Sequence, residues 1–194
     1  MALSIKIVTS NRVTRQFYQS NIEHENALIH RLKNNSQLFA LPSLIISSDM
    51  QTEIFSPKHI VSIEVESQEG VKLELPHIDM YFQAMGSGDE VFAFDLDFDS
   101  DSTIDDNSES PRRARVEFYF QGGHAVTTEL VLNRDDASLA ERTTRITQSF
   151  EQPVIFYQTE NNGLGLFNPQ TITRTVITPR TLVTPTDTII VDEY

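Results

Sequence analysis

Residues 55–60, with the sequence FSPKHI, recur 112 positions later as residues 167–172, with the sequence FNPQTI. Both stretches share the pattern Phe-x-Pro-x-x-Ile. Proline cannot donate a hydrogen bond to a strand ladder, so Pro57 and Pro169 each predict a turn between two strands. The isoleucine that ends each stretch is expected to resume the core-facing pattern of the second strand.

Further matches precede this pair, at a shift of 111 residues. One inserted residue, in the turn SSDMQTE against QTENNGLG, accounts for the change of shift. Repetition over such a length indicates a duplicated unit, and coincidence between two β-rich stretches is the alternative. The matches at the shift of 111 place Leu28, Arg31, Gln37, Phe39 and Pro42 on Leu139, Arg142, Gln148, Phe150 and Pro153.

Each half opens with a predicted β-hairpin. SIKIVTS (residues 4–10) and RVEFYFQ (residues 115–121) alternate apolar and polar side chains, which predicts half-buried strands. Gly122-Gly123 follows the second stretch and Ser10-Asn11 follows the first, and these residues suit the positive φ of a tight turn. Return strands are predicted around 13–18 and 125–132.

A helix and further strands are predicted after each hairpin. Ser20 and Glu23 form an S-x-x-E capping box for a first helix that ends near Asn35. The second helix is expected from acidic residues at its start and basic residues at its end, namely Asp135, Asp136, Arg142 and Arg145. The later strands are predicted at 44–47, 53–55, 61–65 and 71–75, and at 154–158, 164–167 and 171–177.

The fold class that follows is α+β, mostly β. We expect two similar lobes, each a β-hairpin, one helix and a β-meander, related by internal duplication and packed about a pseudo-two-fold axis. The expected division is a first β-rich lobe (1–85), an acidic strand and loop insertion (86–113), a second similar lobe (114–178) and an extended C-terminal arm (179–194).

The charge is concentrated in the insertion. The chain has 28 acidic and 15 basic side chains, a formal charge of −13, which opposes binding to nucleic acid or to an anionic membrane. An alternative hypothesis is an acidic inhibitor or decoy that docks on a basic, nucleic-acid-binding partner through residues 95–109. The nine acids of the insertion are Asp89, Glu90, Asp95, Asp97, Asp99, Asp101, Asp105, Asp106 and Glu109.

The same segment contains a weak match to a calcium-binding loop. Ser100 replaces the required glycine, and no helix pattern precedes the loop. Apolar residues alternate with the aspartates, so a solvated acidic strand is the favoured interpretation. The candidate calcium ligands are Asp95, Asp97, Asp99, Asp101 and Asp106.

The sequence has no strong catalytic motif. Without cysteine, it has no thiolate nucleophile, disulfide or Cys-type zinc site. It has no phosphate loop, dinucleotide fingerprint or nucleophile elbow, and no two histidines have the i, i+4 spacing of a helical zinc pair. We therefore expect a protein that is not an enzyme and has no cofactor. A hydrolase with an unrecognised carboxylate site, or with His77 beside Asp79, is a third hypothesis.

The C-terminal arm carries the partner prediction. Its β-branched residues favour extended structure, and its prolines interrupt a central ladder. The arm is therefore predicted either to pack on its own domain or to add a strand to a neighbouring subunit. The expected function is a structural or adaptor protein that assembles with itself or with partner subunits of a larger complex, such as a viral particle or a secretion-type machine. The predicted partner-binding residues are Leu182, Val183, Ile189, Ile190 and Val191.

The start of the chain shows no export signal, and no apolar run reaches the length of a membrane span. We therefore expect a cytoplasmic location, or one within a viral particle. Homo-oligomerisation or a place in a hetero-complex is expected, with no nucleic-acid or membrane partner.

Overall fold

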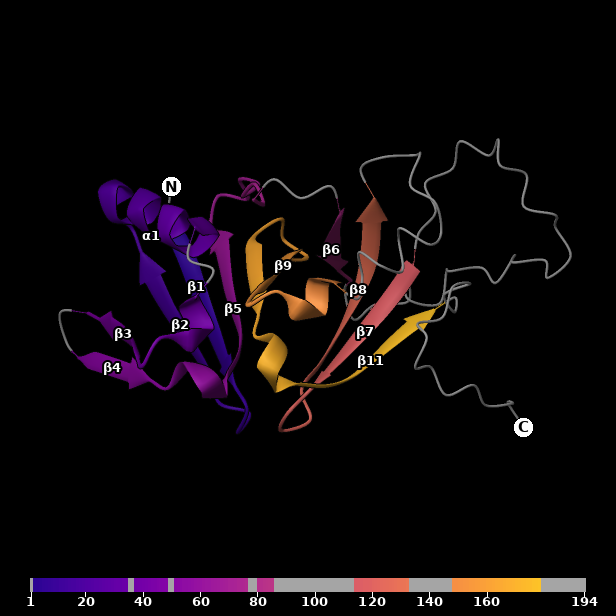
Figure 1. The fold of residues 1–194 in the computed structure, drawn as a ribbon. Helices are drawn as coiled ribbons and strands as arrows, with labels where there is room; N and C mark the ends of the chain where they lie inside the picture. Colours follow the sequence, from indigo (N-terminus) through magenta and orange to yellow (C-terminus); the bar gives the residue numbers. More distant parts are fainter. Residues whose placement is uncertain are drawn as a thin grey trace, which may run out of the picture.

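The computed structural model describes residues 2–34, 37–48, 51–76, 80–85, 114–132 and 148–178 (Figure 1). The described strands form a mixed nine-stranded sheet in the order β11-β7-β8-β6-β9-β10-β5-β1-β2, and a two-stranded sheet of β3 and β4. Within the large sheet, β6 and β9 pair in parallel and the other neighbours are antiparallel. The α+β, mostly β class is confirmed.

The described elements of the two halves share the order of two strands, two further strands, a 3-10 helix and a last strand. In the first half they are β1 (Leu3–Thr9), β2 (Thr14–Gln19), α1 (Ile22–Asn34), the 3-10 helix η1 (Leu38–Ala40), β3 (Leu44–Ser47), β4 (Thr52–Phe55), the 3-10 helix η2 (Pro57–His59) and β5 (Ile60–Ser67). Then come β6 (Met80–Ala84), β7 (Ala114–Phe120), β8 (Ala125–Leu132), β9 (Ile155–Gln158), β10 (Leu164–Phe167), the 3-10 helix η4 (Pro169–Thr171) and β11 (Ile172–Thr178). A helical turn at 148–151 precedes β9, whereas the second helix predicted before it lies outside the described residues.

Strand pairing also recurs at the shift found in the sequence. β1 pairs with β2 and β5, and β7 pairs with β8 and β11. Thr9 lies opposite Ile60, and at the shifted positions Phe120 lies opposite Ile172. Beside each of these two residue pairs, the strand register shifts by one residue in the same way.

The two opening hairpins are closed by the same hydrogen bond, although their turns differ in backbone conformation. Thr9 N donates to Val13 O at 3.0 Å, and Phe120 N donates to His124 O at 2.9 Å. Gly122 and Gly123 have φ of 84° and 80°, as predicted, but in the first turn Arg12, not Asn11, adopts a positive φ of 66°. The Arg12 Nε donates a hydrogen bond to the carbonyl of Gly122 in the other turn. This bond joins the two turns.

Local predictions were accurate for most elements. Strands β3 and β10 have the predicted bounds, and both prolines of the repeated pattern begin a 3-10 turn between strands. The capping box was wrong, because Asn21 Oδ1, not Ser20, accepts the Glu23 N–H, at 3.0 Å. Residues 71–75 are not a strand, although Leu73 N donates to Asn162 O at 2.9 Å.

The predicted β-meanders were wrong, because neither half pairs its second hairpin with its own last strand. β10 of the second half pairs with β5 of the first half, and β4 pairs with β3 alone among the described strands. The hairpin β9–β10 is therefore inserted into the large sheet, whereas the hairpin β3–β4 lies beyond it at the end nearer β2 (Figure 1). The two halves share one sheet.

Two apolar cores lie on opposite faces of this sheet. Leu166 belongs to the core beneath α1, and its neighbour Phe167 belongs to the core formed with β7 and β8. Successive side chains of a strand point to opposite faces, so β10 contributes to both cores. All four residues of β10 are buried, which is the pattern of a strand covered on both sides.

Candidate functional site

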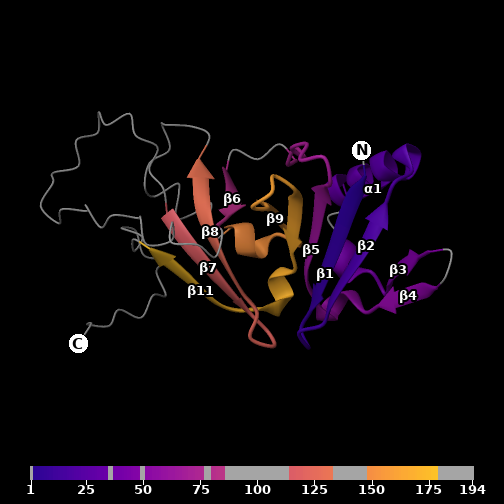
Figure 2. The ribbon, with the colours of Figure 1, turned by 180° about the vertical axis from the view of Figure 1, so that it is seen from behind.

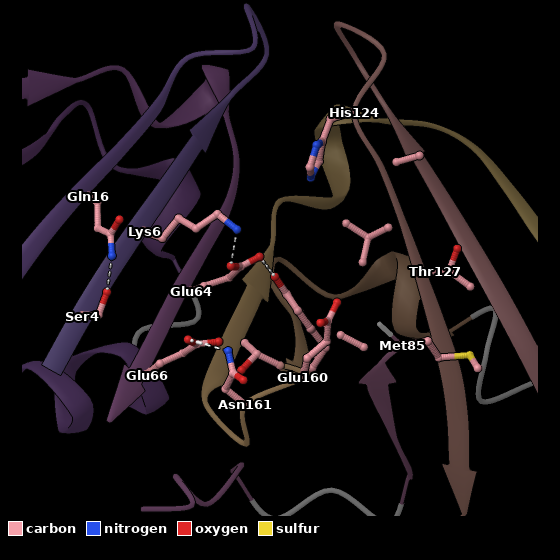
Figure 3. A pocket seen from close by; sticks show the side chains of 15 residues that line it. Ser4, Lys6, Gln16, Glu64, Glu66, Met85, His124, Thr127, Glu160 and Asn161 are labelled. Carbon is pink, nitrogen blue, oxygen red and sulfur yellow. Dashed lines mark hydrogen bonds and ion pairs between the residues drawn. The ribbon is translucent and has the colours of Figure 1, made fainter. Parts of the chain in front are cut away.

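A polar cleft of about 440 Å³ lies where the two halves meet (Figure 3). Its walls come from β1, β2 and β5 of the first half and from residues 124–127 and 159–161 of the second. Side chains from segments far apart in the sequence, including Lys6, Glu64 and His124, point toward it.

The Glu64 carboxylate is the centre of the cleft's hydrogen-bond network. Lys6 Nζ donates to one carboxylate oxygen at 2.8 Å, and the Tyr157 hydroxyl donates to the other at 2.8 Å. Burial, and then the nearby Glu64 charge, raise the pKa of Tyr157 well above 10. Tyr157 therefore stays protonated and acts as a donor, so this network joins β1, β5 and β9 and does not activate a nucleophile.

His124 contributes an imidazole at the same cleft. Its ring centroid lies 5.9 Å from that of Phe120, and burial lowers its pKa below 6.5. It is therefore neutral at pH 7 and supplies no positive charge. In the part of the chain that the structure describes, no three His, Asp or Glu side chains are grouped to hold a metal ion.

The second candidate site is the outer face of the β3–β4 hairpin. Ile45 and Ile54 lie directly opposite each other in register, and they are 58% and 69% exposed. The other face of the hairpin packs on the first core through Leu44, Ile46 and Phe55. The outer face of the hairpin therefore exposes two adjacent large aliphatic side chains, while its inner face is packed.

The β9–β10 hairpin matches β3–β4 at the sequence shifts of 111 and 112, and the same face of this hairpin is covered. Phe156 and Leu166 lie opposite each other in β9 and β10, at the positions equivalent to Ile45 and Ile54. Leu166 is 0% exposed and packs, with Phe156, on the first core. Residues that match at these sequence shifts thus differ in exposure: Leu166 is buried and Phe156 partly buried, whereas Ile45 and Ile54 are exposed.

The described part of the large sheet has two edge strands, β11 and β2. Among the described strands, β11 has β7 as its one neighbour and β2 has β1. Tyr18 on β2 is 65% exposed. Free backbone groups on such strands are able to pair with an added strand.

The site residues predicted from the sequence lie outside the part of the chain that the structure describes. The five candidate calcium aspartates, the five partner-binding residues of the arm and His77 all lie outside the described residues. Sequence reasoning did not identify Ile45 and Ile54, although Ile54 matches Leu166 at the shift of 112 and the two could have been compared.

Comparisons with protein-family models, curated proteins and solved structures found no significant match to this chain. No helix among the described segments has both the length and the apolar character needed to cross a membrane.

Proposed function

We propose that this chain is a non-enzymatic structural or adaptor protein that assembles with itself, or with partner subunits of a larger complex, through its sheet edges and C-terminal arm. The observation that carries the proposal is the exposed Ile45–Ile54 pair, set against buried Leu166 and partly buried Phe156 at the equivalent positions. A hairpin face that is covered within one half and open in the other is suited to being covered by another subunit.

The two halves are, in this proposal, copies of one duplicated unit. Shared element order, shared register irregularities and shared turn hydrogen bonds support it. One further pair is the main-chain bond from Ser10 N to His59 O and the equivalent bond from Gln121 N to Thr171 O, each 2.8 Å long. A duplicated unit offers two versions of each surface, which favours an assembly role.

The arm contributes a strand to a neighbouring subunit in the same proposal. β6 begins 13 positions after the end of β5, from Ser67 to Met80, and it pairs with strands of the second half. The same interval after Thr178, the end of β11, leads to Val191 in the proposed partner-binding stretch. The arm therefore corresponds in position to a segment that already joins two halves.

Size-exclusion chromatography with light scattering tests the proposal. The full-length chain is compared with a chain that lacks residues 182–194, from low micromolar to near-millimolar concentration. We expect the full-length mass to rise above that of one 22.1 kDa chain, and the truncated chain to assemble less. A full-length chain that remains a monomer throughout contradicts self-assembly, and an unchanged oligomer after truncation contradicts the role of the arm.

A further inference from the structure

The contact between β10 and β5 is a contact between the two halves of the repeat. Leu164, Leu166 and Phe167 of the second half lie opposite Val65, Ile63 and Ser62 of the first half. β10 is the second strand of the β9–β10 hairpin, and β5, with which it pairs, is the last strand of the first repeat unit. This geometry shows how one half of the repeat recognises another.

The partners of this contact each have an equivalent elsewhere in the chain. β4 is the equivalent of β10, and β11 is the equivalent of β5, both at the shift of 112. Within the described part of the chain, β4 pairs only with β3 and β11 only with β7. The receiving edge and the arriving hairpin are therefore both present and not joined to each other.

These two surfaces cannot meet within one molecule. The β3–β4 hairpin lies beyond β2 at one end of the sheet, and β11 is the strand at the other end (Figures 1 and 2). The hairpin that fits β11 must come from another molecule.

We propose that the β3–β4 hairpin of one copy of this chain adds to β11 of a second copy, with β4 antiparallel to β11, in the register of the β10–β5 contact. The proposal rests on the assembly function proposed above and specifies its surfaces. Transferring the register of β10 and β5 by 112 positions places Thr52 opposite Ile177, Glu53 opposite Val176, Ile54 opposite Thr175 and Phe55 opposite Arg174.

The side chains support a second copy as the occupant. Leu166 packs on the first core beside Ile63 and Val65, which are 2% and 0% exposed. At the equivalent place in the second half, Ile177 packs against the second core and is partly buried. In the transferred register Ile54 of the arriving copy lies opposite Thr175 and diagonal to Ile177, as Leu166 lies opposite Ile63 and diagonal to Val65. The apolar face of the β3–β4 hairpin and the β11 edge thus correspond to the two surfaces of the β10–β5 contact.

The contact is heterologous, because it joins two different surfaces. Each added copy leaves one hairpin and one β11 edge free, so assembly proceeds head to tail until a ring closes, or continues as a chain.

Disulfide trapping tests the register, and the chain is suited to it because it has no cysteine. Two single variants, Ile54→Cys and Thr175→Cys, are mixed with one of them carrying a size tag, and are then oxidised. Directly opposed residues of antiparallel strands have the Cα separation that a disulfide requires. We expect the mixed dimer to form at least tenfold faster than in a matched mixture of Tyr18→Cys with Thr175→Cys, since Tyr18 is similarly exposed but lies on β2.

A charge substitution gives a second measurement. Ile54→Lys is expected to weaken self-association at least tenfold by light scattering, while its circular dichroism matches the wild type. Ile22→Lys, at a position on α1 that is 64% exposed, is the matched control and is expected to assemble as the wild type does. If the wild type assembles but Ile54→Lys has no effect and the mixed disulfide does not form, the β4–β11 contact is wrong and the assembly function remains. A wild type that never self-associates overturns the β4–β11 contact together with the self-assembly part of the proposed function.

Discussion

Leu166 and Ile54 match at the sequence shift of 112, and truncating each to alanine is expected to have different consequences. Leu166 is 0% exposed and packs in the first core, whereas Ile54 is 69% exposed. Leu166→Ala is therefore expected to lower the free energy of unfolding strongly. Ile54→Ala is expected to leave the stability of the monomer nearly unchanged.

The magnitude follows from the atoms that are removed. Leu→Ala deletes three methylene-sized groups, and at about 0.8 kcal/mol for each one this loses about 2.4 kcal/mol of transfer free energy. Incomplete collapse of the cavity adds to this loss, and buried Leu→Ala changes fall in a range of about 2–5 kcal/mol. We expect about 3 kcal/mol, or a Tm lower by about 6–12 °C for a chain of this size. For Ile54→Ala the expected change is below about 0.5 kcal/mol.

Urea unfolding followed by far-ultraviolet circular dichroism measures both values. The protein is kept dilute, so that self-association does not contribute to the apparent stability. A loss below about 1 kcal/mol for Leu166→Ala would refute the two-sided burial of β10. An equal loss in the two variants would refute the difference between the two hairpins.

Three further predictions concern Gly165 and Tyr157 in the β9–β10 hairpin and His124 in the turn between β7 and β8. Gly165→Ala is expected to destabilise the fold by about 1–3 kcal/mol in urea unfolding, because a side-chain carbon there would overlap the Tyr157 ring; wild-type stability would contradict this packing. Tyr157→Phe is expected to cost about 2 kcal/mol at pH 7, since Glu64 loses a donor. The folded state raises the pKa of Tyr157, so wild-type stability is expected to fall as pH rises above 10, and titration of the Tyr157→Phe variant should lack that part of the decline. Burial lowers the pKa of His124, so stability is expected to fall as pH drops below 6.5; a His124→Phe variant with the same slope between pH 7 and 5 would show that another group titrates.

Much of the local structure was predictable from residue order. Alternation of apolar and polar side chains located β1 and β7, and the repeated Phe-x-Pro-x-x-Ile pattern located two turns between strands. These features depend on short-range sterics and on burial of one face, which neighbouring residues specify. The capping residue was missed by one position because Ser20 and Asn21 are both competent caps.

The site was less predictable than the fold. No pattern along the chain distinguishes Ile54 from Leu166, since both are apolar residues in a short strand before the same turn. Their exposures of 69% and 0% arise from which strand lies beside each one. The polar network of Lys6, Glu64 and Tyr157 likewise joins residues that are up to 151 positions apart (from 6 to 157) and have no shared motif.

The sequence by itself indicated most of the described strands and turns and the repeated Phe-x-Pro-x-x-Ile pattern, and it excluded cysteine chemistry. Only the tertiary structure decided that the second half places its hairpin on β5 of the first half, in one sheet. The physical reason is that backbone hydrogen bonds are the same for every strand, so local pattern does not choose a partner. The choice of partner depends on burial of β10 on both faces, between the two cores. Within the described chain, the β9–β10 hairpin has this burial and the β3–β4 hairpin does not.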